Sequence, residues 1–364
     1  MKQYIFLVIL VGLLFTGCSQ ENEEFIDDVV VVGAVLPLSG PGAFLGQQFQ
    51  RGLELASAQI NDENNIYEIV YEDSKADPRE AISAYQKLKS IDNPDILISA
   101  FSAPSLALIP LVESDGLPMI TSIVSSSQFA QKSDMAFRYF TNADIEAPVM
   151  ARYAIESNFS RFAVIYINDD YGVDYYSRFA ETIAELGGTV VTTENYLRAD
   201  GDFRNQLLKF KNSDAQAIYV IGYDEHMLNI LNQIVELGID KQVFTNWLLA
   251  SPNNAKAAGD SARGVIFTTP NYYLDTSSQK QLFESGFLET YGEQADAYAA
   301  LGYDVGLMLG DIISRSQNRD ELLANLQNLR IQTLMGEISV EADGEMSFGL
   351  IPATYEDGVL IALD

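Results

Sequence analysis

The stretch Val29-Val-Val-Val-Gly-Ala-Val-Leu36 is a continuous apolar run, and Phe49, Leu53, Ala56 and Ile60 follow it at the spacing of one helical face. A short valine-rich run predicts a strand buried on both faces, and recurrence every three or four residues predicts an amphipathic helix. Parallel strands need a crossover connection, which is usually a helix. We therefore expect an α/β fold that begins at residue 29.

The strand-then-helix unit recurs along the chain in two series. Strands alternating with helices predict doubly wound parallel sheets. A chain of 364 residues also exceeds the roughly 250 to 300 residues at which a single core stops growing. We therefore expect two lobes, each with its own sheet. The further strands are expected at 67–71, 95–98 and 118–121 in the first series and at 162–167, 189–193, 216–221 and 264–268 in the second.

The C-terminal part has a different pattern, with a helical stripe over 298–312 followed by short, turn-punctuated strands over 336–363. Such a tail could return to both lobes, so that the chain crosses between them three times. We expect the first lobe to contain residues 29–141 and about 270–332, and the second to contain 142–269 and about 333–364.

The N-terminus has the layout of a secretion signal. Lys2 precedes an apolar run at 4–15, and small residues lead to Cys18. The run is shorter than the about 20 residues that span a bilayer, so we expect a cleaved signal over 1–17, with an uncleaved anchor as the alternative. Leu14-Phe-Thr-Gly-Cys18 resembles the bacterial lipobox, with Phe15 where leucine is usual, which implies a lipid on Cys18. The acidic stretch 18–28 is expected to be a tether outside the cytoplasmic membrane.

Composition excludes several classes of function. The 51 Asp and Glu residues against 22 Lys and Arg give a net charge of −29, and no basic stripe exists that could neutralise phosphates, so we expect no nucleic-acid partner. A hydrophobic fraction of 48% is too high for a disordered acidic chain.

Two hydroxyl-rich turns follow neighbouring strands of the first series. Ser99, Ser102 and Ser105 follow one strand, and 121–127 (TSIVSSS) follows the next. The carboxyl edge of a parallel sheet is where ligands bind, and helix amides and hydroxyls there can converge on an anionic group. The alternative is that these serines only cap helices and turns.

In the second series, Tyr171 and Tyr223 occupy the corresponding strand ends. Their rings could form an apolar wall over a small ligand, with the phenols fixing polar atoms. Packing is the alternative for these tyrosines, and equally for Phe101 and Trp247.

The sequence gives little evidence for a catalytic, cofactor or metal site. Gly40, Gly42 and Gly46 follow a strand, but their spacing is one residue longer than the dinucleotide fingerprint requires. His226 is the only histidine, and 168–170 (NDD) is too short for a calcium loop. We therefore expect no cofactor, no metal and no enzyme, with an exported enzyme using His226 as the alternative.

A resemblance covers the whole mature chain. Residues 37–52 (PLSGPGAFLGQQFQRG), followed in order by 71–73, 116–120, 170–172 and 299–304, are similar to the type I periplasmic binding proteins. The similarity is greatest to the branched-chain amino-acid (Leu/Ile/Val) binding proteins of ABC importers. It implies two lobes that close around a solute, an ABC permease as partner, and a monomer. A ligand-sensing receptor of the same fold is the alternative.

The resemblance also assigns roles to residues. Ser102 resembles the serine that binds the ligand carboxylate, with the Val124 amide and Ser125 beside it, and Ser105 on the same turn. Tyr171 and Tyr223 match aromatic cleft residues, with Phe101 and Trp247 as further candidates. Amino-acid binders usually place a glutamate for the ammonium group within 244–248, where this chain has Trp247 or Leu248. We therefore expect a small polar or amphipathic solute that is branched-chain amino-acid-like, an amide or a carboxylate.

Overall fold

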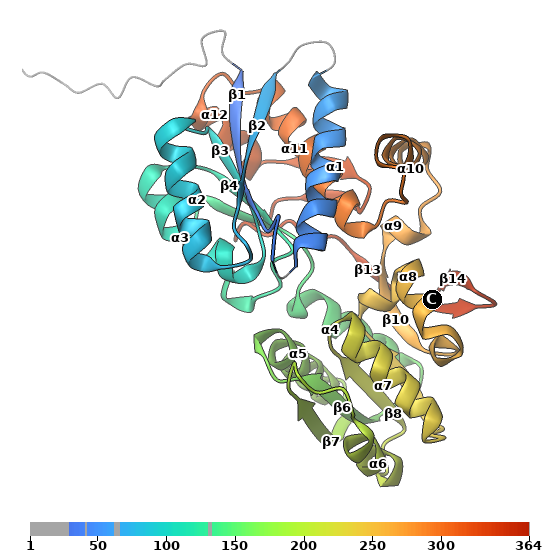
Figure 1. Ribbon diagram of the computed structural model, residues 1–364. Coiled ribbons are helices and arrows are strands. Elements are labelled where there is room, and N and C mark those ends of the chain that lie inside the picture. Colours follow the sequence, from blue (N-terminus) through green and yellow to red (C-terminus); the bar gives the residue numbers. More distant parts are fainter. Residues whose placement is uncertain (1–28, 41, 62–65, 130–132, 364) are drawn as a thin grey trace, which may run out of the picture.

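The computed structural model describes residues 29–40, 42–61, 66–129 and 133–363 (Figure 1). The expected signal at 1–17, the tether at 18–28 and Cys18 lie outside this range. Among the helices of the described part, none combines the length and the apolar character needed to cross a membrane.

The first lobe is built on a five-stranded parallel sheet in the order β2-β1-β3-β4-β5. Two helices pack in the core on one face, α1 and α11, and two on the other, α2 and α3. The expected doubly wound sheet is therefore confirmed. Its elements are β1 (Val30–Leu36), α1 (Ala43–Asn61), β2 (Tyr67–Asp73), α2 (Pro78–Ile91), β3 (Ile96–Ala100), α3 (Ser102–Asp115), β4 (Met119–Ser122), β5 (Ala136–Tyr139), α11 (Ala297–Ser314) and α12 (Arg319–Gln327).

The second lobe has a seven-stranded sheet in the order β14-β13-β10-β9-β8-β6-β7. Five strands are parallel, and the C-terminal hairpin of β13 and β14 adds an antiparallel edge that the sequence pattern did not distinguish. Helices α4 and α5 pack on one face, and α6 and α7 on the other. The elements are α4 (Ala143–Glu156), β6 (Arg161–Ile167), α5 (Asp170–Glu185), β7 (Thr189–Tyr196), α6 (Arg204–Asn212), β8 (Ala217–Ile221), α7 (Asp224–Glu236), β9 (Gln242–Thr245), α8 (Pro252–Ala258), β10 (Ile266–Pro270), β13 (Leu350–Glu356) and β14 (Val359–Ala362).

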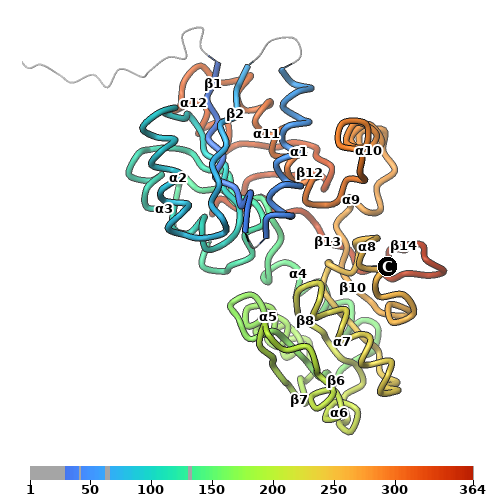
Figure 2. Tube along the Cα trace, viewed as in Figure 1, coloured from blue at the N-terminus to red at the C-terminus, as the bar shows by residue number. Residues whose placement is uncertain are grey.

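The chain passes between the lobes three times. The second-lobe elements that flank these passages are α4, β10 and β13, and they lie side by side (Figure 2). The first passage joins β5 to α4. The second leads from β10 through α9 (Asn271–Leu274) to α10 (Ser278–Tyr291), whose Phe283 and Phe287 are buried in the first lobe. The expected hinge of three crossings is therefore present.

We place the third crossing at 348–350, later than the position near 333 expected from the sequence. A hairpin of β11 (Arg330–Thr333) and β12 (Gly336–Ser339) precedes it. The apolar side chains of this segment pack in the core of the first lobe, so the tail leaves that lobe only after them. They are Leu334, Met335, Ile338, Met346 and Phe348.

Helices α1 and α11 touch backbone to backbone. A Cβ added at Gly52 would lie 1.8 Å from the Ala299 carbonyl oxygen, and one at Gly302 would lie 1.9 Å from that of Phe49. Glycine is required at both positions because any side chain would force the helices apart.

Candidate functional site

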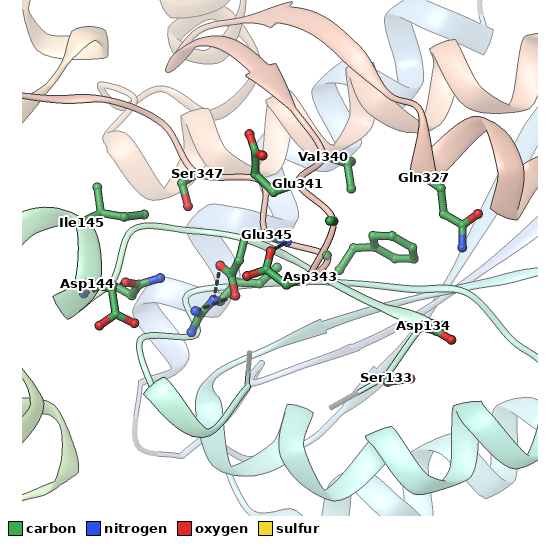
Figure 3. Close-up of a pocket in the computed structure, with 15 residues that line it drawn as sticks. Ser133, Asp134, Asp144, Ile145, Gln327, Val340, Glu341, Asp343, Glu345 and Ser347 are labelled. Atoms are coloured by element: carbon green, nitrogen blue, oxygen red, sulfur yellow. Dashed lines mark hydrogen bonds and ion pairs between the residues drawn. The ribbon is translucent and has the colours of Figure 1, made fainter. Parts of the chain in front are cut away.

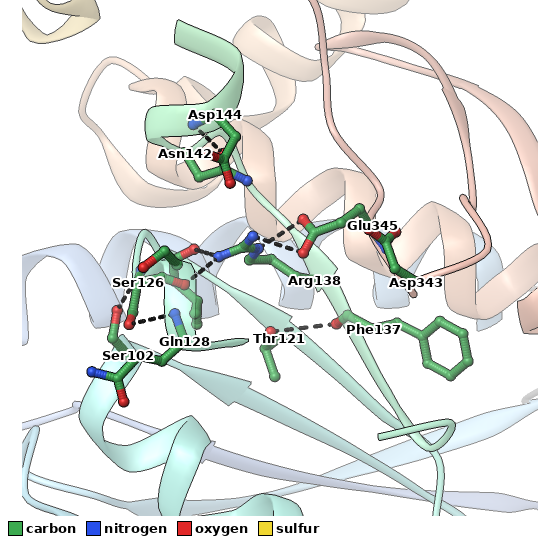
Figure 4. A network of polar contacts seen from close by, with 12 residues as sticks. Ser102, Thr121, Ser126, Gln128, Phe137, Arg138, Asn142, Asp144, Asp343 and Glu345 are labelled. Carbon is green, nitrogen blue, oxygen red and sulfur yellow. Dashed lines mark hydrogen bonds and ion pairs between the residues drawn. The ribbon is translucent and has the colours of Figure 1, made fainter. Parts of the chain in front are cut away.

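The sheet order brings the two hydroxyl-rich turns together. Strands β3 and β4 are neighbours, so Ser102, the first residue of α3, lies beside the loop that follows β4. The Ser126 amide donates to Ser102 Oγ at 3.3 Å (Figure 4). Ser102 is partly exposed, and its hydroxyl hydrogen remains available to a ligand.

Both turns contain a non-glycine residue in the left-handed region. Phe101 has a φ of 70° and Ile123 a φ of 57°. Such a backbone costs on the order of 1–3 kcal/mol per residue and persists where the surrounding structure holds it, which is common at ligand sites. The strain therefore marks this edge of the sheet as a specialised turn.

Phe101 also explains one glycine of the loop after β1. A Cβ added at Gly42 would lie 2.3 Å from the Phe101 ring, and Gly42 has a φ of 81°. The ring thus lies directly against this loop and is partly buried. Glycine at position 42 therefore leaves the space that the Phe101 ring occupies.

The loop after β4 carries free amide donors. The Val124 side chain is buried in the core of the first lobe, and Ser125 is partly exposed. Among the residues that the structure describes, none accepts a hydrogen bond from the amide of Val124 or Ser125. Two unpaired amides beside a serine hydroxyl and a helix start can bind a carboxylate or amide oxygen.

Ser105 is placed differently from Ser102. It is fully buried, and its hydroxyl hydrogen-bonds with Ser99 Oγ at 2.9 Å. Of the two predicted serines on α3, only Ser102 is therefore available to a ligand.

In the second lobe, Tyr171 and Tyr223 stack with ring centroids 5.1 Å apart and an interplanar angle of 24°. Asn246 Nδ2 donates to the Tyr171 hydroxyl at 2.7 Å, and the Tyr223 hydroxyl donates to Asp169 at 3.1 Å. Burial, reinforced by nearby acidic groups, raises the pKa of both phenols above the ordinary value, so they are neutral donors at physiological pH. The structure thus forms one aromatic surface from two separate strand ends.

Trp247 belongs to the packing between the lobes. It is 5% exposed, and its ring lies 6.1 Å from Phe140 and 6.0 Å from Tyr298, both edge-on or tilted. Its amide donates to Glu146 Oε1 at 2.7 Å. Trp247 is therefore held by its surroundings on both the ring and the backbone.

Glu146 was not predicted from the sequence. It is fully buried in the first turn of α4 and also accepts hydrogen bonds from Thr268 and from Tyr175, the latter at 2.8 Å. Burial raises the pKa of this carboxyl. All its contacts are distant in sequence, so no local pattern could have revealed them.

A hydrogen bond across the lobes connects the two halves of the site. The Ser127 amide, two residues after Ser125, donates to Asp174 Oδ2 at 3.3 Å. Asp174 lies one helical turn after Tyr171 in α5, which is on the side of the second lobe nearest the first (Figure 1). The serine loop and the tyrosine pair therefore belong to one region between the lobes.

Within the described part of the chain, His226 makes no hydrogen bond to an acidic side chain. His226 is buried against Tyr196 and Phe203, and its Nε2 lies 3.0 Å from the Arg198 carbonyl oxygen. No group of three or more His, Cys, Asp or Glu residues is positioned to hold a metal ion within the described ranges.

Two α/β lobes, three crossings and polar groups from both lobes at their junction define the class of two-lobed solute-binding proteins. The chain belongs to the periplasmic binding protein family, whose model matches residues 29–358. The resemblance to its type I members of the branched-chain amino-acid group is confirmed. This is a family of extracytoplasmic solute-binding proteins rather than enzymes.

Among curated relatives, the chain is 24% identical over 344 residues to the Leu/Ile/Val-binding protein of Citrobacter freundii, which covers 92% of this chain and 93% of that protein. It is also 24% identical to the Leu/Ile/Val/Thr-binding protein of Salmonella typhimurium, with coverage of 92% and 93%.

Solved structures share the fold. The branched-chain amino acid transporter substrate binding protein of Streptococcus pneumoniae in complex with isoleucine has a TM-score of 0.80 and 23% identity, covering 92% of this chain and 98% of that one. A solute binding protein of Rhodopseudomonas palustris in complex with 3,4-dihydroxybenzoic acid has a TM-score of 0.79 and 21% identity, covering 93% and 96%.

Proposed function

We propose that this protein captures a small solute between its lobes by closing around it and delivers the solute to an ABC permease. One observation carries the proposal: the free amides of Val124 and Ser125 and the Ser102 hydroxyl lie in one region with the Tyr171–Tyr223 pair, joined by the Ser127–Asp174 hydrogen bond. Contacts that need both lobes stabilise the closed form only when the solute is present.

The donors of the first lobe favour a ligand with a carboxylate or an amide oxygen. They combine two amides, one hydroxyl and the start of α3, where the helix dipole favours negative charge. The stacked tyrosines, with the Arg198 guanidinium 4.5 Å from the centre of the Tyr223 ring, supply an aromatic wall for the rest of the ligand. The solute is thus a small polar or amphipathic molecule.

The second lobe limits how an ammonium group could be held. Trp247 or Leu248 stands where amino-acid binders usually place a glutamate, and the nearby Glu146 already accepts three hydrogen bonds from the protein. A buried ammonium without a carboxylate would be strongly disfavoured, so an ammonium group here would depend on Asp169 beside Tyr223 or on Asp174 of α5. The similar proteins include a Leu/Ile/Val-binding protein and a solute binding protein in complex with 3,4-dihydroxybenzoic acid. Aliphatic amino acids and aromatic acids are therefore the solutes to be tested first.

A ligand screen tests the proposal. Soluble protein from residue 29 would be screened by thermal shift against leucine, isoleucine, valine, benzoate, 3,4-dihydroxybenzoate, acetamide and urea, with calorimetry on each hit. A ligand at 100 times its dissociation constant should add about 2.7 kcal/mol to the free energy of unfolding. Small-angle scattering should then show a smaller radius of gyration with the ligand. Binding without any compaction would contradict capture by closure.

We further propose that the mature protein is a monomeric lipoprotein anchored outside the cytoplasmic membrane through Cys18. Several acyl chains on one cysteine anchor a protein stably, whereas one chain does not. In the native host, Cys18→Ser should move the protein from the membrane fraction to the soluble fraction. A variant that remains fully in the membrane fraction would contradict the anchor.

A further inference from the structure

Arg138 is a buried cation that contacts the ligand loop, which comprises residues 123–127 after β4. It lies in β5, is 1% exposed, and is the largest of the fully buried side chains in the described part of the chain. Its Nε and Nη2 donate to the two oxygens of Glu345 at 2.8 and 2.7 Å (Figure 4). This bidentate geometry fixes the plane of the guanidinium, because both of its parallel N–H groups are engaged.

The remaining nitrogen of Arg138 is directed to the loop after β4. Nη1 donates to the carbonyl oxygen of Ser126 at 2.7 Å and, more weakly, to that of Val124 at 3.4 Å. These carbonyls share their peptide groups with the amides of Ser127 and Ser125, respectively. A cation on a carbonyl polarises the same peptide group and strengthens its N–H as a donor.

The two polarised amides have different partners. The Ser125 amide is one of the free donors assigned to the solute, and the Ser127 amide donates to Asp174 in the second lobe. One guanidinium therefore supports both the proposed ligand contact and the contact between the lobes.

Glu345 lies on the segment that leads to the third crossing. This segment runs parallel to β5, because the Arg138 amide donates to Gly344 at 2.9 Å and the Met346 amide donates to Arg138 at 2.8 Å. Phe348 then packs edge-on against Tyr139 with ring centroids 5.9 Å apart. The ion pair thus ties the third crossing to the strand that enters the first.

A pocket of about 970 Å³ opens beside this pair, where the first lobe meets the start of α4 (Figure 3). Its lining includes Asp134, Asp144, Glu341 and Asp343 as well as Glu345. Burial is the main cause that raises the pKa of Glu345, and Asp343 and Asp144 add to it, whereas Arg138 lowers it. Arg138 is the cation in this lining that opposes this rise, and its two hydrogen bonds hold the Glu345 carboxyl in place.

From these contacts we infer that Arg138, oriented by Glu345, is a positioning residue that couples the ligand loop 123–127 to the third hinge crossing and to the contact between the lobes. The inference rests on the proposed function for the ligand contact only. The coupling of the loop to the hinge is a property of the free protein and can be tested without a ligand.

The main variant is Arg138→Met combined with Glu345→Met. Replacing a buried ion pair by apolar residues of similar size is often neutral for stability, so this double variant should fold with a melting temperature close to that of the parent protein. Arg138→Lys is the second variant, because it keeps the charge but not the fork geometry. Arg319→Met is the control, since it cuts the Arg319–Asp95 pair in the same lobe.

Hydrogen exchange followed by mass spectrometry reads out the free protein. Peptides covering 121–129 should exchange at least tenfold faster in the double variant, because the amides of Ser126, Ser127 and Phe129 lose the support of the loop. The exchange rate of the same peptides in Arg138→Lys should lie between those of the parent protein and the double variant. In Arg319→Met it should equal that of the parent protein. Unchanged exchange in both Arg138 variants would overturn the coupling.

Affinity for a hit from the screen separates this inference from the proposed function. The double variant should bind that compound at least tenfold more weakly at an unchanged melting temperature. Faster exchange with unchanged affinity would overturn the role in ligand binding. A screen that yields no hit would count against the proposed function alone, since the exchange experiment needs no ligand.

Discussion

Buried ionisable side chains in this protein are held by hydrogen bonds from distant parts of the chain. Asp304 in α11 is fully buried and accepts from the Tyr139 hydroxyl at 2.7 Å and from the amides of Leu334 and Met335 at 2.8 and 3.2 Å. Burial raises the pKa of Asp304 to about 6, although these hydrogen bonds oppose the rise. The residue joins α11, β5 and the β11–β12 hairpin.

This pKa predicts a pH-dependent contribution to stability. Between pH 4 and 6 the folded protein holds a proton on Asp304 that the unfolded chain, with a carboxyl pKa of about 3.9, has released. The contribution is therefore fully present below pH 4 and is lost as pH rises through 6, by about 3 kcal/mol. Urea unfolding at pH 4, 5, 6 and 7 should show the advantage of the parent protein over Asp304→Asn shrinking by this amount. A pH-independent difference would contradict the assignment.

Ser102 and Ser105 form a matched pair for testing the ligand site. Ser102→Ala removes a hydroxyl that we propose binds the solute, and it should weaken binding about tenfold, since a hydrogen bond contributes roughly 1 to 1.5 kcal/mol. Ser105→Ala breaks the buried bond to Ser99 and should lower the melting temperature with little change in affinity. Calorimetry and thermal unfolding on both variants check this. The reverse pattern would place the site elsewhere.

At the scale of elements, the first lobe depends on the direct contact of α1 with α11. Glycines at 52 and 302 allow backbone atoms of the two helices to meet, whereas Gly286 in α10 has room, because an added Cβ would be 3.8 Å from its nearest neighbours. Glycine-to-alanine changes at Gly52 and Gly286 are therefore expected to change the free energy of unfolding in opposite directions.

Gly52→Ala should destabilise the first lobe by about 1 to 3 kcal/mol, because overpacking forces the helices apart. Gly286→Ala should stabilise the protein by up to about 1 kcal/mol, since alanine favours a helix interior over glycine. Denaturant unfolding measures both. A stabilising Gly52→Ala would show that the two helices can separate without cost.

At the scale of the whole molecule, a net charge of −29 imposes self-repulsion on the folded state. Salt screens this repulsion, because the Debye length falls from about 30 Å at 0.01 M to about 8 Å at 0.15 M. The melting temperature should therefore rise as sodium chloride increases over this range. Sucrose at the same osmolality is the control for non-electrostatic effects. A melting temperature that falls with salt would mean that attractive ion pairs outweigh the repulsion.

The sequence by itself determined the α/β class, the two lobes and the strand ends at which Ser102, Tyr171 and Tyr223 stand. Apolar periodicity reports local structure, and residues such as Phe49 and Leu53 carry it over one or two helical turns. The spacing of Gly40, Gly42 and Gly46 likewise indicates a tight turn after β1, where Gly40 and Gly42 have positive φ, and the structure adds the contact of Gly42 with Phe101.

Only the tertiary structure decided which polar groups meet. The neighbouring positions of β3 and β4 bring Ser102 to Ser126, while one helical turn of α3 separates the partly exposed Ser102 from the buried Ser105. Arg138 and Glu345 are 207 residues apart in the chain, and their pairing depends on the late third crossing. Burial makes such pairs necessary, because a charge removed from water requires a partner, but no local spacing in the sequence says which one.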